Sequence, residues 1–381
     1  PTPVVPAYGD VTELNTDRTI LDSVGAATLQ NLAADAVALL DTSLAVYERN
    51  GDYAFGMFVS EWCGMMDGAS RKLCGTTDNR EALRCGKWLC HETCWHESAK
   101  TAIDSGEPTD IECVGGIRMY AVPIRSGNEV IGAVSLGYGN PPTDDETLAA
   151  LASTFDIDVE RVREAARSYK PRPPLIIEMA KRRVASIART VGEIVERKQA
   201  QDALREADLR IQNAVKAGDV GLWDWDLVTN KVHYTPEWKA QIGYSDDEIA
   251  DDYEEWRSRL HPEDLEAIVA AVQDSIARAS QGHRTEFRFR HKDGSYRWIL
   301  AQAAILTDEH GKAVRMLGSH VDITDAKERE AELTQARATL QAAMDNSTAG
   351  IAIADAPDGK LRYVNKAGLL IRGGTEEEVV R

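Results

Sequence analysis

The six cysteines are gathered in one stretch and are the clearest candidates for a chemical site. On a helix, Cys90 and Cys94 would place both thiols on one face. A loop residue, Cys63, and a strand residue, Cys113, would complete four soft sulfur ligands, which suit Zn²⁺ or an iron–sulfur cluster. We therefore predict a metal or iron–sulfur site with the ligands Cys63, Cys90, Cys94 and Cys113. Cys74 and Cys85 are possible extra thiols.

Two other interpretations of these cysteines stay open, a redox switch that forms a disulfide and a set of reduced structural thiols. The stretch lacks the paired CxxC knuckles of ordinary structural zinc sites. His91 lies between Cys90 and Cys94, which excludes c-type haem attachment. His91 and His96 are backup ligands, although we expect both to be surface histidines. A thiolate site suits sensing, because metal loss or oxidation changes local charge and packing.

Composition limits the kinds of protein that could carry this site. The 381 residues include 44 basic and 62 acidic side chains, a net charge of −18 that argues against a nucleic-acid partner. The longest apolar run, at 130–138, is far shorter than the ~20 residues of a membrane span. We expect an acidic, soluble, cytoplasmic protein. The chain starts without Met and stops within what looks like a further domain, so we expect a piece of a longer protein.

The cysteines fall in a region of mixed helix and strand patterns. Apolar spacing predicts a helix over 28–46, and two β-rich runs within 111–138 predict a hairpin that turns at 126–128. A helical tail follows at 143–168. Length at ~150 residues per domain gives two or three domains. We predict a leader or linker at 1–20 and a domain that carries the cysteines at 21–170.

Helical segments follow this region and separate it from the next ones. The pattern over 175–217 is broken only by Gly192, and a helix of ~40 residues spans ~60 Å, more than one domain core requires. Such a length indicates a connector at 171–217, as in coiled coils, or a long helix packed within one domain. A second connector is predicted at 326–345, where Asp325 and Glu328 form an acidic capping box.

The segment 218–325 reads as two strands, short helices and three antiparallel strands, a small α+β domain. Residues 346–381 begin like a second copy, because GIAIADAPDGKLRYVN echoes GLWDWDLVTNKVHYT. The predicted fold class is therefore α+β and multidomain, with antiparallel sheets, flanking helices and long connector helices.

Residues 218–330 resemble a PAS domain of the PAS fold 3 type, through GLWDWDLVTNKVHYTPEWKAQIGYSDDEI, LHPEDL, EFRFRHKDGSYRWI and GSHVDITDAKERE. Asn365 occupies the position of a frequent family Asn, which Thr235 takes in the first copy. His261 is expected to cap a helix. We expect Trp223, Trp225 and Trp298 to pack in the core. The alternative is that they contact a flavin or another aromatic ligand. The resemblance implies a domain that transmits a signal or dimerises.

Residues 28–170 resemble the sensory domain named after PocR, a regulator that responds to small diols. The likeness lies in SEWCGMM, CHETCWHE, IECVGGIRMYAVPI and NEVIGAVSLGYG. The chain departs from that family by adding Cys74, Cys85 and Cys90. These additions suggest a cofactor that ordinary members lack.

The order of these regions is that of the input half of a modular signalling protein. The resemblances imply a small-molecule, metal or redox signal, a homodimer, and an output kinase domain that acts on a response regulator in a two-component system. The chain itself shows no catalytic domain. The alternatives are the sensory region of a diguanylate cyclase, a thiol or iron–sulfur redox protein, and a passive dimerisation scaffold.

Overall fold

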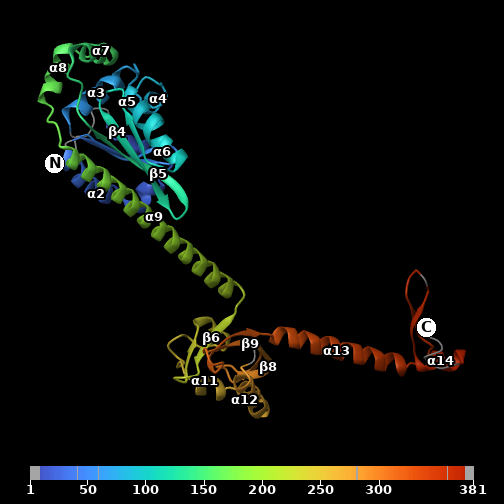
Figure 1. The fold of residues 1–381 in the computed structure, drawn as a ribbon. Helices are drawn as coiled ribbons and strands as arrows, with labels where there is room; N and C mark the ends of the chain where they lie inside the picture. The colour runs from blue at the N-terminus through green and yellow to red at the C-terminus, as the bar shows by residue number, and fades with distance from the viewer. Residues whose placement is uncertain (1–8, 41, 59, 280–281, 358, 374–381) are drawn as a thin grey trace. The chain divides into compact units, whose positions relative to one another are not determined.

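The computed structural model describes residues 9–373 except 41, 59, 280–281 and 358. Contacts divide the chain into two compact units, 1–207 and 208–381. We call them the sensory unit and the C-terminal unit (Figure 1). The predicted α+β class is confirmed, because each unit contains a five-stranded antiparallel sheet with helices.

The sheet of the sensory unit has the order β2-β1-β5-β4-β3. Its strands are β1 Ser43–Glu48, β2 Tyr53–Phe58, β3 Thr109–Glu112, β4 Arg118–Ser126 and β5 Glu129–Tyr138. The predicted hairpin is confirmed as β4–β5, and Gly127 takes the positive φ of 57° in its turn. Strand β5 lies in the middle and is buried over most of its length, which explains its nearly continuous apolar sequence.

Helices cover both faces of this sheet. They are η1 Val11–Leu14, α1 Thr19–Val24, α2 Ala26–Leu40, α3 Glu61–Lys72, α4 Asn79–Ala82, α5 Leu89–His91, the π-helix η2 Glu92–Ala99, α6 Lys100–Ser105, α7 Asp145–Phe155 and α8 Val159–Ser168. One face packs against α1, α2 and the long helix α9, Pro174–Ala217. The other face carries η2 and α6, with α3 and α7 in an adjoining apolar cluster (Figure 1).

Two local predictions in this unit need correction. The helix predicted over 28–46 ends at Leu40, because the alternating Leu44 and Val46 are buried within a strand that pairs on both sides. The segment 1–20 was expected to be a leader or linker. Its described part, from Gly9 onward, instead forms η1 and enters α1, which packs against the sheet.

Helix α9 confirms the long helical prediction and divides into two parts. Its first part lies in the apolar core of the sensory unit through Ala180, Val184, Ile187, Ala188, Val191 and Val195. Gly192 lies close against the sheet, because a Cβ there would lie 1.9 Å from the carbonyl oxygen of Arg125. Beyond the core, Leu204 and Ile211 are 72% and 62% exposed. The sensory core therefore includes helix that the sequence assigned to a connector.

The sheet of the C-terminal unit has the order β7-β6-β10-β9-β8. Its elements are β6 Gly221–Asp226, β7 Lys231–Tyr234, α10 Pro236–Gln241, α11 Tyr253–Arg257, α12 Pro262–Ala277, β8 His283–Arg290, β9 Tyr296–Thr307 and β10 Ala313–Asp322. The predicted three antiparallel strands are confirmed as β8, β9 and β10. The core gathers aromatic and aliphatic side chains between the sheet and the short helices.

The chain continues with α13 Thr324–Asp345, β11 Ala352–Ala354, β12 Leu361–Val364 and α14 Lys366–Arg372. Helix α13 starts one residue before Asp325, and Asp322 rather than Asp325 accepts the N–H of Thr324 at 2.8 Å. The predicted strand pair is confirmed as β11–β12. Asp358 in the predicted turn and residues 374–381 lie outside the described residues.

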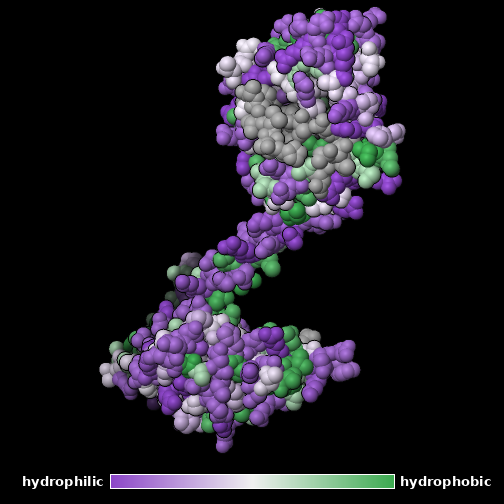
Figure 2. All heavy atoms as spheres, turned by 90° about the vertical axis from the view of Figure 1, so that its left-hand side faces the viewer, coloured by the Kyte–Doolittle hydropathy of each residue, from purple (hydrophilic) through white to green (hydrophobic). Residues whose placement is uncertain are grey.

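On the face shown in Figure 2, the coloured part of the surface is mostly hydrophilic, with small separate hydrophobic patches. Among the described residues, no helix combines the length and the apolar character that crossing a membrane requires.

Candidate functional site

The four cysteines predicted as ligands come from four elements of the sensory unit. Cys63 lies in the first turn of α3, Cys90 in α5, Cys94 in η2, and Cys113 directly after β3. Burial first, and then the charge of neighbouring thiols of this set, raise the pKa values of Cys90, Cys94 and Cys113. The fold therefore gathers these thiols in one region, which we call the four-thiol region.

Burial keeps the four thiols protonated. It raises the pKa of Cys113 to about 11 and the pKa values of Cys90 and Cys94 well above the ordinary value. Burial also raises the pKa of Cys63, whose Sγ accepts a hydrogen bond from Ser43 Oγ at 3.6 Å. Since the thiolate is the nucleophile, these buried thiols are poorly reactive as they stand.

A metal site at these thiols requires several ligand side chains close enough to hold one ion. Four sulfur donors suit Zn²⁺ or an iron–sulfur cluster by their chemistry. However, the searched part of the chain contains no group of three or more His, Cys, Asp or Glu side chains placed to hold one metal ion. The present geometry does not fit a formed metal centre, so we derive no signalling step through a metal. Metal binding at Cys63, Cys90, Cys94 and Cys113 stays a prediction.

The two histidines beside these cysteines differ from each other. His96 is exposed as expected, but His91 is buried, because η2 and α5 turn it toward Tyr53 and Trp88. Its Nδ1 lies 2.9 Å from the hydroxyl oxygen of Tyr53. Burial, followed by the nearby His96, lowers the pKa of His91 to about 4, so its ring is neutral near pH 7.

A polar cleft of about 320 Å³ lies beside this pair. Its walls come from η1, the β1–β2 turn, α4 and η2, and include Asp52, Tyr53, Arg84, His91 and His96. The volume falls at the lower end of the range for small-molecule sites. The cleft is a feature that the sequence alone did not reveal.

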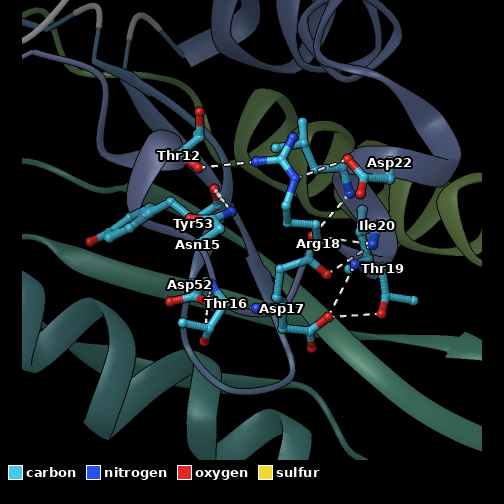
Figure 3. A network of polar contacts seen from close by, with 12 residues as sticks. Thr12, Asn15, Thr16, Asp17, Arg18, Thr19, Ile20, Asp22, Asp52 and Tyr53 are labelled. Atoms are coloured by element: carbon cyan, nitrogen blue, oxygen red, sulfur yellow. Dashed lines mark hydrogen bonds and ion pairs between the residues drawn. The ribbon is translucent and has the colours of Figure 1, made fainter.

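The wall contributed by the N-terminal segment is held in place by a polar network (Figure 3). Asp52 accepts the N–H groups of Thr16 and Asp17 at 2.6 and 2.9 Å. The side-chain amide of Asn15 donates to the carbonyl oxygen of Tyr53 at 3.0 Å. These bonds attach the segment before α1 to the β1–β2 turn.

A buried carboxylate completes that attachment. Glu48, at the end of β1, accepts the N–H groups of Ile20 and Leu21 in the first turn of α1, each at 2.9 Å. Burial raises the pKa of Glu48 to about 7, even though these donors favour the ionised form. The carboxylate therefore changes charge close to physiological pH. Sequence reasoning missed it because a single Glu in an apolar strand carries no spacing signal.

The C-terminal unit contains a small apolar cavity of about 40 Å³. Trp223 and Trp225 line it as the sequence suggested, together with Tyr253, Trp256 and His320. This volume holds a water molecule or two and lies far below the ~300 Å³ of organic ligand sites. In this conformation the aromatic side chains fill the space that a flavin would need.

The polar atoms around this cavity were not visible in the sequence. Within the described residues, the buried Trp223 Nε1 and His283 Nε2 have no hydrogen-bond partner. His320 is buried among aromatic rings, and burial lowers its pKa to about 3. Trp298 does not line the cavity; Arg288 and Lys327 lie over its ring. His261 caps α12 as predicted, accepting the N–H of Glu263 at 3.2 Å.

Thr235 and Asn365 have the same structural role in the two copies of the repeat. Thr235 Oγ1 accepts the N–H of Leu222 at 3.0 Å and caps α10. Asn365 Oδ1 accepts the N–H of Ile351 at 2.7 Å and caps α14. Each side chain thus joins the preceding strand segment to the following helix. This shared contact supports the internal repeat and assigns both residues to structure.

Comparisons with known proteins agree with this division of the chain. Residues 22–197 match the family model described as the sensory domain found in PocR, and residues 231–320 match the PAS fold. The first match extends into α9, as the buried part of that helix does.

This chain spans less than a third of the length of the curated relatives that it matches. A probable diguanylate cyclase, DgcE, of Escherichia coli is 26% identical over 50% of this chain and 17% of its own length. The sensor protein FixL of Bradyrhizobium diazoefficiens is 26% identical over 42% of this chain and 31% of its own length.

Among solved structures, a sensory box histidine kinase/response regulator from Burkholderia thailandensis is 32% identical. The match covers 35% of this chain and 98% of that chain, with a TM-score of 0.31. Residues 22–197 are therefore a PocR-type sensory domain and residues 231–320 a PAS domain, which together form a sensory input region of a signalling protein.

Proposed function

We propose that this chain is the input half of a cytoplasmic sensor histidine kinase, in which the PocR-type domain detects a chemical signal and α9 relays it. One observation carries the proposal. The first part of α9 lies in the sensory core, and the same continuous helix runs to Ala217, close before β6 of the PAS domain. A change in the sensory core therefore acts on the helix that leads to the next domain.

The signal would act on the sheet face opposite α9. Cys63 contacts Ser43 of β1, and Cys113 immediately precedes the turn into β4. Strand β4 in turn supplies the Arg125 carbonyl that Gly192 of α9 meets. A small molecule that rearranges the four-thiol region would thus shift strands that α9 packs against. Close packing transmits such shifts because it leaves little free volume.

The proposed assembly is a homodimer joined along the connector helices. Leu204 and Ile211 are seven residues apart on the exposed part of α9, and Leu333 and Leu340 are seven apart on α13. This is the heptad spacing of a coiled-coil seam. In a homodimer, the same leucine and isoleucine positions of the second copy would pack against these residues on each helix. The two connectors would then carry the signal as a change of register or rotation.

The output activity is the least direct part of the proposal. A histidine kinase that phosphorylates a response regulator is favoured by the match to a blue-light-activated histidine kinase of Brucella anthropi, which is 27% identical over 37% of this chain and 29% of its own length. A diguanylate cyclase is the second candidate, because DgcE matches over a comparable share of the chain.

The test uses the complete protein that contains this chain. Two or seven residues are inserted after Arg205 of α9, and both phosphohistidine formation and cyclic diguanylate synthesis are measured. Seven added residues restore the phase of a heptad seam, whereas two rotate it by more than half a turn. We expect the seven-residue variant to keep regulated output and the two-residue variant to lose it. Equal regulated output from the two variants would contradict a relay through α9.

A further inference from the structure

Cys74 and Cys85 form a second thiol site, separate from the four-thiol region. Cys74 follows the end of α3, and Cys85 follows α4; both are partly exposed. The Cys74 thiol donates to the carbonyl oxygen of Ala82 at 3.7 Å, and the N–H of Cys85 donates to the same oxygen at 3.2 Å. Through this shared carbonyl oxygen, the two cysteines lie next to each other.

Backbone donors make the two thiols unequal. The N–H of Lys87 donates to Cys85 Sγ at 3.2 Å, and the N–H of Trp88 is a further donor. Burial alone would raise the pKa of Cys85, but the Cys74 thiol and these two N–H groups lower it. Burial, followed by the hydrogen bond to Cys85, raises the pKa of Cys74 to about 12. Cys85 is therefore the more acidic thiol of the pair, and Cys74 is the less acidic one.

We propose that Cys74 and Cys85 are a reversible oxidation site, which a hydroperoxide converts into a disulfide. The Cys85 thiolate attacks one peroxide oxygen, so that an S–O bond forms, the O–O bond breaks, and the leaving oxygen takes a proton as water or an alcohol. Cys85 is then a sulfenic acid. Cys74 loses its proton to the departing hydroxide and attacks the Cys85 sulfur. The S–S bond forms, the S–O bond breaks, and water leaves. A low-molecular-weight thiol reverses the reaction by disulfide exchange.

The location of the pair gives the disulfide a structural effect. It would tie the end of α3 to the end of α4, and Leu83 and Arg84 beside it line the 320 Å³ cleft. Oxidation would thus fix one wall of that cleft. The modification itself does not depend on the output activity proposed above, so its failure and the failure of the relay are separate results.

The experiment uses the reduced 381-residue chain and hydrogen peroxide. After limited oxidation, free thiols are blocked and the protein is digested with trypsin. We expect a disulfide between the peptide of residues 73–80, which holds Cys74, and the peptide of residues 85–87, which holds Cys85. Pulse alkylation with iodoacetamide at pH 7 should modify Cys85 at least about tenfold faster than Cys113, because a tenfold higher thiolate fraction corresponds to one pKa unit.

Two variants separate the roles. Cys74→Ser should leave Cys85 to accumulate as a sulfenic acid that dimedone traps, and Cys85→Ser should abolish the fast reaction with peroxide. Circular dichroism checks that both variants are folded, and Cys113 in the same samples is the internal control. The proposal is overturned if peroxide links other cysteines first, or if Cys85 in the unmodified chain reacts no faster than Cys113.

Discussion

The contact between Gly192 and β4 predicts an unusual result for a helical glycine. Replacing an interior helix Gly with Ala normally stabilises a protein by about 1 kcal/mol, because Ala has the better helix propensity. At Gly192 the added Cβ would lie 1.9 Å from the Arg125 carbonyl oxygen, whereas ordinary contact begins near 3.4 Å. Helix α9 must then move away from the sheet by the difference, 3.4 − 1.9 = 1.5 Å.

A displacement of that size loosens packing along a buried helix face. Overpacking a core costs about 1–3 kcal/mol, and the helix preference of Ala returns about 1 kcal/mol. We therefore expect Gly192→Ala to lower the free energy of unfolding of the sensory unit by up to about 2 kcal/mol. The matched control is Gly68→Ala in α3, where nothing lies within 4 Å of the added Cβ. That variant should gain about 0.5–1 kcal/mol.

The assay is hydrogen exchange measured by mass spectrometry along a urea series, because it follows the sensory unit separately from the PAS domain. Peptides that cover 180–195 should lose protection at lower urea in Gly192→Ala and at higher urea in Gly68→Ala. If the two variants shift in the same stabilising direction, α9 is not packed against β4 as described, and the relay loses its physical basis.

Three further predictions concern charge and assembly. The folded pKa of Glu48, about 7, exceeds its unfolded value. The free energy of unfolding should therefore fall by up to about 3 kcal/mol as pH rises from about 4.5 to 7, and Glu48→Gln should remove this slope in urea titrations. An unchanged pH slope in Glu48→Gln would contradict this role of Glu48. His320 has a folded pKa lowered to about 3, so its stabilisation is full above about pH 6.5 and is lost as pH falls toward 3. His320→Phe should make thermal unfolding less acid-sensitive, and equal sensitivity in both proteins would disprove that role. Leu340→Lys should weaken dimerisation in sedimentation velocity. The control Gln335→Lys, at an exposed position of α13, should not. Equal dissociation of the two variants would contradict the proposed coiled-coil seam.

Periodicity predicted the long elements well, because α9 and the strands β8, β9 and β10 carry repeating apolar patterns. Periodicity failed where pairing with distant strands determines the secondary structure. Residues 43–46 continue an apolar run that suits a helix, yet β2 and β5 pair with that segment on both sides and make it a strand. The close approach of Gly192 to Arg125 was also invisible, since it depends on how a helix meets a sheet more than 60 residues earlier in the chain.

The candidate site divides in the same way. The spacing of Cys90 and Cys94 and the types of Cys63 and Cys113 were enough to predict that these thiols share a region. Burial of Glu48 and His320 could not be read from their neighbours in the sequence, because both point into cores assembled from distant elements. Their pKa values are consequences of that burial.

The six cysteines lie in one stretch of the sequence, from Cys63 to Cys113, but burial and hydrogen bonding shift their pKa values in opposite directions. In the four-thiol region burial raises the thiol pKa values, which lowers the reactivity of these groups toward oxidants. At Cys85 the surrounding donors lower the pKa and favour reaction with an oxidant. These opposite pKa directions separate the predicted ligand site at Cys63, Cys90, Cys94 and Cys113 from the proposed oxidation site at Cys74 and Cys85.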